Sequence, residues 1–410
     1  MTGPRRALVI VALVGALLVS ASCSSAERAA PPDGTTPGSP PRAATVDFSV
    51  PGPYRVGTTR LTVGATKAVV YYPADEAGVD RAEHVTSYSS GDAFSPELRA
   101  LVAATVPELV QDLPLDAYRD VRINPEGPFP IVVHSHGFGG FYLFASHHFA
   151  QLASWGFVVA APDHPSRDLA AVAANKAVTA GDPDVADLMR TLDVLQEQNT
   201  KAGSPLRGEL DTDRVGTEGH SAGGRASYLF ATKDARVKVW IGQAPSAPIT
   251  YVPGDEALTP EEQLATQVER LKRAPRLMKP AMIVAADKDT VVPFLGVQAE
   301  YDWLGVPKRL DIVRNAGHAG FIDVCRPIRE QGGLQKYAEQ LPAFAPLFKL
   351  GDDGCGAANT DPVKQAAFID HVMIAQYRVA FGLDATDASL APEYLQRQFP
   401  EAFGGQQLAK

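Results

Sequence analysis

The chain has 410 residues, of which 45% are hydrophobic and 21% are charged, which is an ordinary composition for a globular protein. This length is ample for one large hydrophobic core. A formal net charge of -9 argues against a nucleic-acid partner held by phosphate contacts, and the charge says nothing more about a substrate.

Residues 1–23 have the pattern of an export signal. Two arginines precede an apolar stretch over 7–19, which is too short for an ordinary transmembrane helix, and small residues then lead to Cys23. A cysteine in this place is typical of bacterial lipoprotein processing, although two serines in the run depart from the usual pattern. We predict lipidation at Cys23, with ordinary signal cleavage and an uncleaved signal anchor as alternatives. Residues 24–45 are rich in Ser, Pro, Ala, Gly and Thr, and we expect a flexible tether.

From residue 46 to residue 385 the sequence alternates between strand-like and helix-like segments. This alternation predicts one α/β domain with a mostly parallel central sheet and helices on both faces. We expect insertions near 74–128 and 322–365, and a C-terminal tail over 386–410. In chain order, the predicted elements are a β-hairpin over 56–72, a helix after Ser95, a strand over 129–134, a helix near 149–152, a strand over 155–163, a helix after Asp182, a strand before and a helix after residue 221, a charged helix over 260–273, strands over 281–286 and 310–313, and a terminal helix over 371–381.

The insertion at 74–128 contains one clear element. Ser95 and Pro96 begin a predicted helix, and the apolar residues from Leu98 to Val110 recur on one side of it. This helix either packs on the sheet or partly covers the site as a lid, and the sequence leaves both roles open.

A serine stands inside Gly219-His220-Ser221-Ala222-Gly223, after a strand-like run and before a helix-like one. A serine on a sharp turn between strand and helix needs small neighbours, because a Cβ at position 219 or 223 would collide with the bent backbone. This arrangement is a nucleophile elbow and predicts Ser221 as a catalytic nucleophile. Because the motif alone also occurs by chance, the assignment of Ser221 as a nucleophile depends on the segments around it.

The downstream segments supply an acid and then a histidine, the order that is typical of α/β-hydrolases. The apolar run over 281–286 predicts a buried strand, and Asp287 and Asp289 follow it. After the strand at 310–313, His318 lies in a loop flanked by glycines. We favour Asp289 as the acid, because two further residues past the strand let its carboxylate curl back over the sheet. Asp287 remains the competing candidate.

Upstream, the strand over 129–134 breaks into a glycine-rich loop over 135–140, where backbone N–H groups can converge on an oxyanion. His134 and His136 could be taken for metal ligands, but a metallo-hydrolase H-x-H-x-D-H motif needs an acid where Phe138 stands. We therefore expect no metal. The loop also lacks the Lys-Ser/Thr pair of a phosphate-binding loop.

Two cysteines remain if Cys23 is lipidated. They are Cys325 and Cys355, and an exported protein reaches a compartment that permits disulfides. We predict that they pair and fasten the segment after His318. The alternative is two buried free thiols.

Five blocks of sequence stand in one order: 52–59, 70–73, 134–140, 152–160 and 219–224. Together they resemble the platelet-activating-factor acetylhydrolase family, and bacterial esterases with the related polyester-hydrolase and cutinase group share the later blocks. The resemblance runs approximately from residue 50 to residue 325. Separate blocks in the same order are far more specific than any single block.

This resemblance implies the α/β-hydrolase fold and hydrolysis of carboxylic esters without a metal or an organic cofactor. It places the nucleophile on Ser221, the acid on Asp289 and the base on His318. It also implies an oxyanion hole made by the backbone amides of Phe138 and Ala222. The insertions cannot be aligned with the family, and such loops shape an acyl pocket.

We expect a small-molecule or lipid ester as the substrate, with Phe141 and Tyr142 lining an acyl or aromatic pocket. The first function class is an exported serine esterase acting on short-chain or phospholipid-like esters, and longer lipids, polyesters or amides are the runner-up substrates. The second class is a surface binding protein on a hydrolase scaffold that no longer turns over. Contact with a membrane is expected only through the N-terminal anchor, and the sequence does not determine the oligomeric state.

Overall fold

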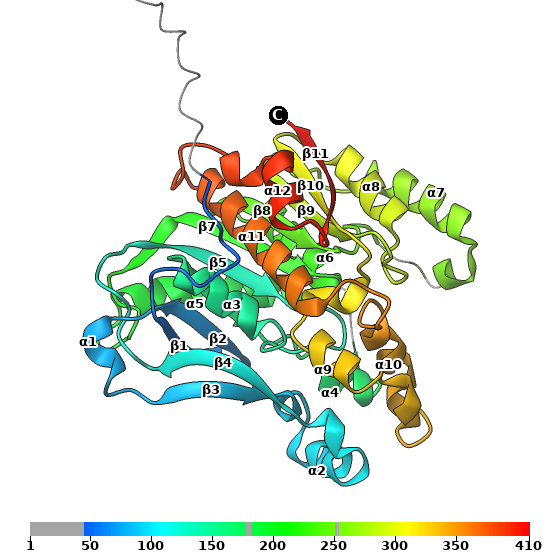
Figure 1. Ribbon diagram of the computed structural model, residues 1–410, viewed down its shortest axis with the longest axis horizontal. Helices are drawn as coiled ribbons and strands as arrows, with labels where there is room; N and C mark the ends of the chain where they lie inside the picture. Colours follow the sequence, from blue (N-terminus) through cyan, green and yellow to red (C-terminus); the bar gives the residue numbers. More distant parts are fainter. Residues whose placement is uncertain (1–44, 178–181, 251, 253) are drawn as a thin grey trace, which may run out of the picture. The chain divides into compact units, whose positions relative to one another are not determined.

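The computed structural model describes residues 45–177, 182–250, 252 and 254–410, and these residues form an 11-stranded sheet with helices around it (Figure 1). From residue 45 to the C-terminus they belong to one compact unit. The strands are β1 (Val56–Val63), β2 (Thr66–Pro73), β3 (His84–Ser89), β4 (Asp112–Arg119), β5 (Phe129–Ser135), β6 (Val158–Pro162), β7 (Leu210–His220), β8 (Val237–Gln243), β9 (Ala281–Ala286), β10 (Lys308–Val313) and β11 (Phe403–Ala409). The α-helices are α1 (Glu76–Val79), α2 (Pro96–Thr105), α3 (Ser146–Ser154), α4 (Leu169–Ala173), α5 (Pro183–Thr200), α6 (Ala222–Lys233), α7 (Pro260–Leu271), α8 (Phe294–Trp303), α9 (Cys325–Glu330), α10 (Ala345–Asp352), α11 (Pro362–Ala380) and α12 (Pro392–Gln398).

The middle of the sheet is parallel. The neighbouring strands β6, β5, β7, β8, β9 and β10 pair in parallel, and β2 and β11 pair antiparallel at the two ends of this set. Parallel strands present their carboxyl ends at one edge, and open α/β sheets bind ligands at that edge. The loops after β5, β7, β9 and β10 therefore meet there.

Helices cover both faces of the sheet because successive strand residues point to opposite sides. In β5, Val132 packs into the core that includes α3 and α11, whereas Ile131 and Val133 pack into the core that includes α5 and α6. Each buried aliphatic side chain of this kind contributes about 1.5–3 kcal/mol. The predicted mostly parallel sheet with helices on both faces is confirmed.

The insertion at 74–128 is more regular than the sequence indicated. It contributes β3 and β4, which extend the sheet beyond β1. The Ser95 hydroxyl caps α2 by accepting from the Leu98 amide at 3.3 Å, but the helix ends at Thr105, and a 3-10 turn over Pro107–Leu109 follows. Leu101, expected on the apolar side, is 56% exposed.

The prediction of a C-terminal tail over 386–410 is wrong. This segment forms α12 and β11, and β11 pairs antiparallel with β10, with Ala409 opposite Lys308. The strand contains two glycines and two glutamines, and an edge strand does not need the apolar run that identifies a buried one. The chain therefore ends as one edge of the sheet.

The second insertion, near 322–365, contains α9 and α10 and lies between β10 and α11. A disulfide joins Cys325 to Cys355 across it. Among residues 45–410, outside the gaps, no helix is both long enough and apolar enough to cross a bilayer. The expected export signal and Cys23 lie outside the described residues.

Candidate active site

Ser221 lies at the sharp turn between β7 and α6. Its φ of 57° is rare for a residue other than glycine. A Cβ on Gly219 would lie 2.2 Å from the carbonyl oxygen of Gly223, and a Cβ on Gly223 would lie 1.9 Å from the carbonyl oxygen of Ser135. Only glycine lets β5, β7 and α6 approach so closely. The turn leaves Ser221 8% exposed, at the wall of a cavity.

His318 and Asp289 lie on the loops that follow β10 and β9. The Nδ1 atom of His318 is 2.8 Å from Oδ2 of Asp289, and both side chains are buried. The other carboxylate oxygen, Oδ1, accepts from the backbone amides two and three residues further on, at 2.8 and 2.7 Å. The Asp287 carboxylate instead accepts from the Ala316 amide at 3.2 Å. The structure thus brings Asp289, and not Asp287, to the imidazole.

The contact with Asp289 fixes the tautomer of His318. A carboxylate can only accept, so in the neutral imidazole Nδ1 carries the proton and Nε2 is the free base. Nε2 is buried and has no hydrogen-bond partner among the described residues, the Ser221 hydroxyl included. Ser221 and His318 nevertheless line the same cavity. Catalytic hydrogen bonds often tighten only when substrate binds.

Asp353, which the sequence did not single out, joins the acid loop to the histidine loop. Its Oδ2 accepts from the amide and the hydroxyl of Thr290, at 2.9 and 2.7 Å, and its carbonyl oxygen accepts from the Ala319 amide at 2.8 Å. Gly317 makes room for it, because a Cβ there would lie 2.2 Å from Oδ1 of Asp353. Sequence pattern gives no signal for this contact, since the residue lies in an insertion.

The backbone amides of Phe138 and Ala222 are unpaired among the described residues, as an oxyanion hole requires. Ala222 is the first residue of α6, where helix N–H groups have no intrahelical partner and the helix dipole favours negative charge. Phe138 lies in the glycine-rich loop after β5 and lines the cavity. Both expected donors thus lie where β5 and β7 end.

Arg167 holds the glycine-rich loop from behind. It is fully buried, donates to the carbonyl oxygen of His136 and to Oγ of Ser135, and pairs with Asp184 at 2.9 Å. Its own carbonyl oxygen accepts from the Gly139 amide at 2.9 Å. These contacts hold the loop on both sides of Phe138, through the His136 carbonyl and the Gly139 amide.

His220 has a role that sequence reasoning missed. Its side chain lines the cavity, and its ring lies 4.6 Å from that of His318, centroid to centroid. Burial lowers the pKa of His220 well below its usual value, so the ring is neutral. Its Nε2–H donates to the backbone carbonyl of His318 at 2.9 Å. His220 therefore positions the loop that carries His318, and its place beside the elbow was the only signal.

A buried charged network lies behind the elbow. Oε1 of Glu218 lies 3.0 Å from Nδ1 of His134 and 3.0 Å from Nε2 of His148. Nδ1 of His148 lies 2.6 Å from Oδ1 of Asp370. Burial alone would lower the pKa of His148, but the two carboxylates raise it to about 10. Burial likewise opposes the charge of Glu218, yet the two histidines lower its pKa to about 2. His134 has a lowered pKa because of burial, so His148 is the imidazolium of the network.

A second Ser-His-Asp set is structural. Oγ of Ser135 lies 2.9 Å from Nε2 of His164, whose Nδ1 is 3.2 Å from Asp187. Ser135 is 0% exposed, and its hydroxyl also takes a hydrogen bond from Arg167, so no substrate reaches it. Across the described part of the chain, no group of His, Cys, Asp or Glu side chains is arranged to hold a metal.

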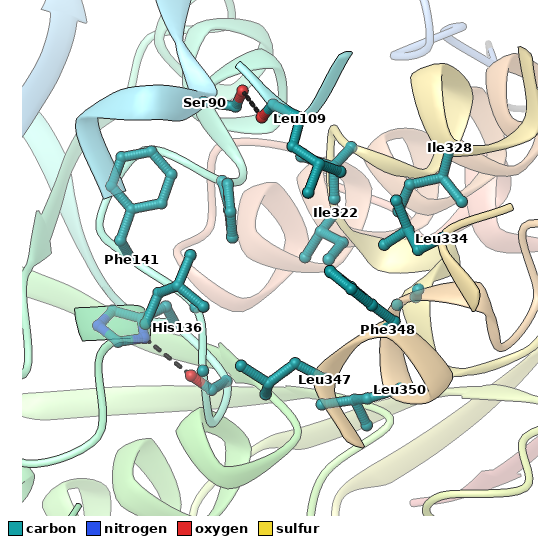
Figure 2. Close-up of a pocket in the computed structure, with 18 of the residues that line it drawn as sticks. Ser90, Leu109, His136, Phe141, Ile322, Ile328, Leu334, Leu347, Phe348 and Leu350 are labelled. Carbon is teal, nitrogen blue, oxygen red and sulfur yellow. Dashed lines mark hydrogen bonds between the residues drawn. The ribbon is translucent and has the colours of Figure 1, made fainter. Parts of the chain in front are cut away.

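A cavity of about 180 Å³ is lined by Ser221 and His318 among others. Figure 2 shows part of its lining, with His136 and Phe141 on one side. Phe141 lines it, as expected. Tyr142 does not line it, so that expectation is wrong: this ring is buried with the Lys67 ammonium 4.7 Å from its centroid. Adjacent residues on a tight turn point in different directions, which sequence alone did not resolve.

Comparison with known proteins bears on the family and the fold of this chain. Residues 44–202 match the family model described as platelet-activating factor acetylhydrolase, isoform II. The structure is similar to that of a ferulic acid esterase from Streptomyces cinnamoneus, with a TM-score of 0.58, 20% sequence identity, and coverage of 90% of this chain and 99% of that chain. At this identity the likeness concerns the fold, and it confirms the predicted α/β-hydrolase fold. The chain therefore has the α/β-hydrolase fold and is similar over residues 44–202 to the platelet-activating-factor acetylhydrolases.

Proposed function

We propose that this protein is an exported serine esterase that cleaves short-chain or phospholipid-like esters through Ser221, His318 and Asp289. The observation that carries the proposal is the contact of 2.8 Å between His318 and Asp289 beside a strained serine turn. The free amides of Phe138 and Ala222 support it, since they give a developing oxyanion two donors.

The chemistry follows from the positions of the groups. Oγ of Ser221 attacks the ester carbonyl carbon, and its proton passes to Nε2 of His318, while Asp289 stabilises the imidazolium. The carbonyl oxygen becomes an oxyanion held by the amides of Phe138 and Ala222, each worth about 3 kcal/mol. Collapse of this intermediate expels the alcohol, which takes the proton from His318 and leaves an acyl-serine. Water then attacks the acyl-serine by the same route, releasing the acid and restoring the serine.

Before attack, Ser221 and His318 have to come into hydrogen-bond contact. The unpaired, buried Nε2 favours this step, because a buried acceptor without a partner costs about 1–3 kcal/mol. With water excluded by a bound ester, the Ser221 hydroxyl, which lines the same cavity, is the donor that we propose for Nε2.

Export and anchoring at Cys23 complete the proposal. The disulfide between Cys325 and Cys355 supports export, because disulfides persist in oxidising compartments. We expect wild type to be extracted from membranes only with detergent and the Cys23→Ala variant to be released without it. Release of wild type in buffer alone would contradict lipid anchoring.

The decisive experiment uses a fluorophosphonate probe with wild type, Ser221→Ala and Ser135→Ala. The last variant is the matched control, because Ser135 belongs to the buried Ser-His-Asp set. We expect labelling of wild type and of Ser135→Ala, with the modified peptide containing Ser221, and no labelling of Ser221→Ala. Persistent labelling and ester turnover in Ser221→Ala would overturn the assignment. The absence of both in wild type would favour the non-catalytic binding protein.

A further inference from the structure

The cavity at Ser221 has two walls, and each comes from one insertion. Phe94, Val102 and Leu109 belong to the first insertion and line one side. The other side is formed by the segment 322–351, which lies outside the stretch that matches the acetylhydrolase family model. Figure 2 shows Ile328, Leu334 and Phe348 of this segment across the cavity from His136.

Hydrogen bonds join the two walls of the cavity. Nε2 of Gln331 donates to the carbonyl oxygen of Glu108 at 2.9 Å, and the Tyr88 hydroxyl donates to the Asp323 carboxylate at 2.8 Å. Asp323 also accepts from the His147 amide at 3.0 Å, which joins the second wall to α3. These hydrogen bonds join the second wall to the first wall and to α3.

One wall begins at the oxyanion loop. A Cβ on Gly139 would lie 2.7 Å from a methyl carbon of Leu347, so this leucine packs directly against the residue after Phe138. An ester whose carbonyl oxygen points to the Phe138 amide therefore starts its acyl carbons along Leu347. The chain then continues toward Leu334 and Ile328, which are apolar.

We propose that this cavity is an acyl site for a saturated chain of about six to eight carbons. The length follows from the volume, because a protein cavity of about 150 Å³ holds one benzene, which has six carbons. The cavity here is about 180 Å³. The inference rests on the proposed function and goes beyond it by naming the acyl group. Each methylene buried between the walls raises kcat/KM by about fourfold until the space is full.

A phenolic acyl group is the competing ligand. Gln331 lines the cavity, and its buried Oε1 has no hydrogen-bond partner among the described residues, so a phenol that reached it would find an acceptor. The remaining lining between Leu347 and Ile328 favours an alkyl chain, because it offers carbon atoms along the whole path from the oxyanion loop.

The experiment measures kcat/KM for p-nitrophenyl esters from acetate to laurate and for p-nitrophenyl ferulate, so that the leaving group stays constant. Leu334→Trp narrows the cavity at a partly exposed position, and Leu408→Trp on β11 is the matched control at an exposed edge. We expect kcat/KM of wild type to rise about 250-fold from acetate to hexanoate, about fourfold for each of the four added methylenes, and to reach a maximum or plateau at hexanoate and octanoate. Leu334→Trp should lose about tenfold or more on octanoate and stay within about threefold on acetate. Leu408→Trp should match wild type on both.

The two proposals fail in different ways. A Ser221-dependent enzyme with an acyl profile that is flat or greatest at acetate, or with equal losses for all esters in Leu334→Trp, overturns the acyl site and leaves the serine mechanism standing. Faster turnover of the ferulate than of the octanoate also overturns it, in favour of a phenolic acyl group. Turnover that survives in Ser221→Ala contradicts the proposed function itself. Melting temperatures of the variants show that each one is folded.

Discussion

Replacing Asp289 by Asn separates the two aspartates that follow β9. The Asn Oδ1 can still accept from the two backbone amides that hold the Asp289 carboxylate at 2.8 and 2.7 Å, so the loop keeps its shape. The Asn amide nitrogen then faces Nδ1 of His318, 2.8 Å from it in the present geometry. Because two donors cannot face each other, Nδ1 becomes the acceptor and the proton moves to Nε2. The imidazole can no longer take the serine proton.

We expect kcat to fall by about 10⁴-fold, which corresponds to about 5 kcal/mol of transition-state stabilisation. Asp287→Asn is the matched control, because Asp287 accepts one hydrogen bond, from the Ala316 amide at 3.2 Å, that an Asn oxygen can also accept. Its kcat/KM should stay within about threefold of wild type. The assay is p-nitrophenyl ester hydrolysis with melting curves of both variants. Full activity in Asp289→Asn with loss in Asp287→Asn would refute the reasoning.

Three further changes probe the surroundings of the site. Arg167→Lys keeps the positive charge but loses the two-pronged donation to the His136 carbonyl and the Ser135 hydroxyl. We expect kcat to fall about tenfold or more, with KM little changed. An unchanged kcat in a folded variant contradicts this role. The raised pKa of His148, about 10, means that its contribution to stability is complete below about pH 6.5 and is lost as pH rises through 10. The melting temperature of wild type should therefore fall as pH rises over this range. The His148→Gln variant should melt at a lower temperature that depends less on pH. Equal pH dependence in the two proteins would show that the His148 charge does not contribute to stability. Opening the disulfide with Cys325→Ser and Cys355→Ser should cost about 3–4 kcal/mol in guanidinium unfolding, given the separation of 30 residues, and an unchanged midpoint excludes a structural bond.

The parts of the site that the sequence predicted share one property: local backbone geometry demands them. The glycines at 219 and 223 are required by close contacts, and a serine between them in a strand-turn-helix context predicts the elbow. The buried apolar runs predicted β5, β9 and β10, and therefore the loops that carry Phe138, Asp289 and His318. Chain order and strand position were enough to bring these residues to one edge of the sheet.

The parts that the sequence did not predict depend on contacts between distant segments. The role of His220 follows from a hydrogen bond to a carbonyl 98 positions away, and the role of Arg167 from contacts across 31 positions. No periodicity encodes such contacts. Strand β11 was missed for another reason: an edge strand with polar residues on a solvated face has neither the length nor the apolar run that separates strand from tail.

The second insertion connects specificity to chemistry. Between Cys325 and Cys355 the chain forms a cavity wall, and at its end Asp353 accepts hydrogen bonds from Thr290 and from the Ala319 amide, next to His318, the proposed base. A side chain in the middle of the wall, such as Leu334, lines the cavity, so we expect a change there to alter which ester fits. A change at Asp353 acts on the placement of the acid and the base, so it alters turnover of every ester. One covalently closed segment thus contains both a wall of the cavity and the residue that joins the loops of Asp289 and His318.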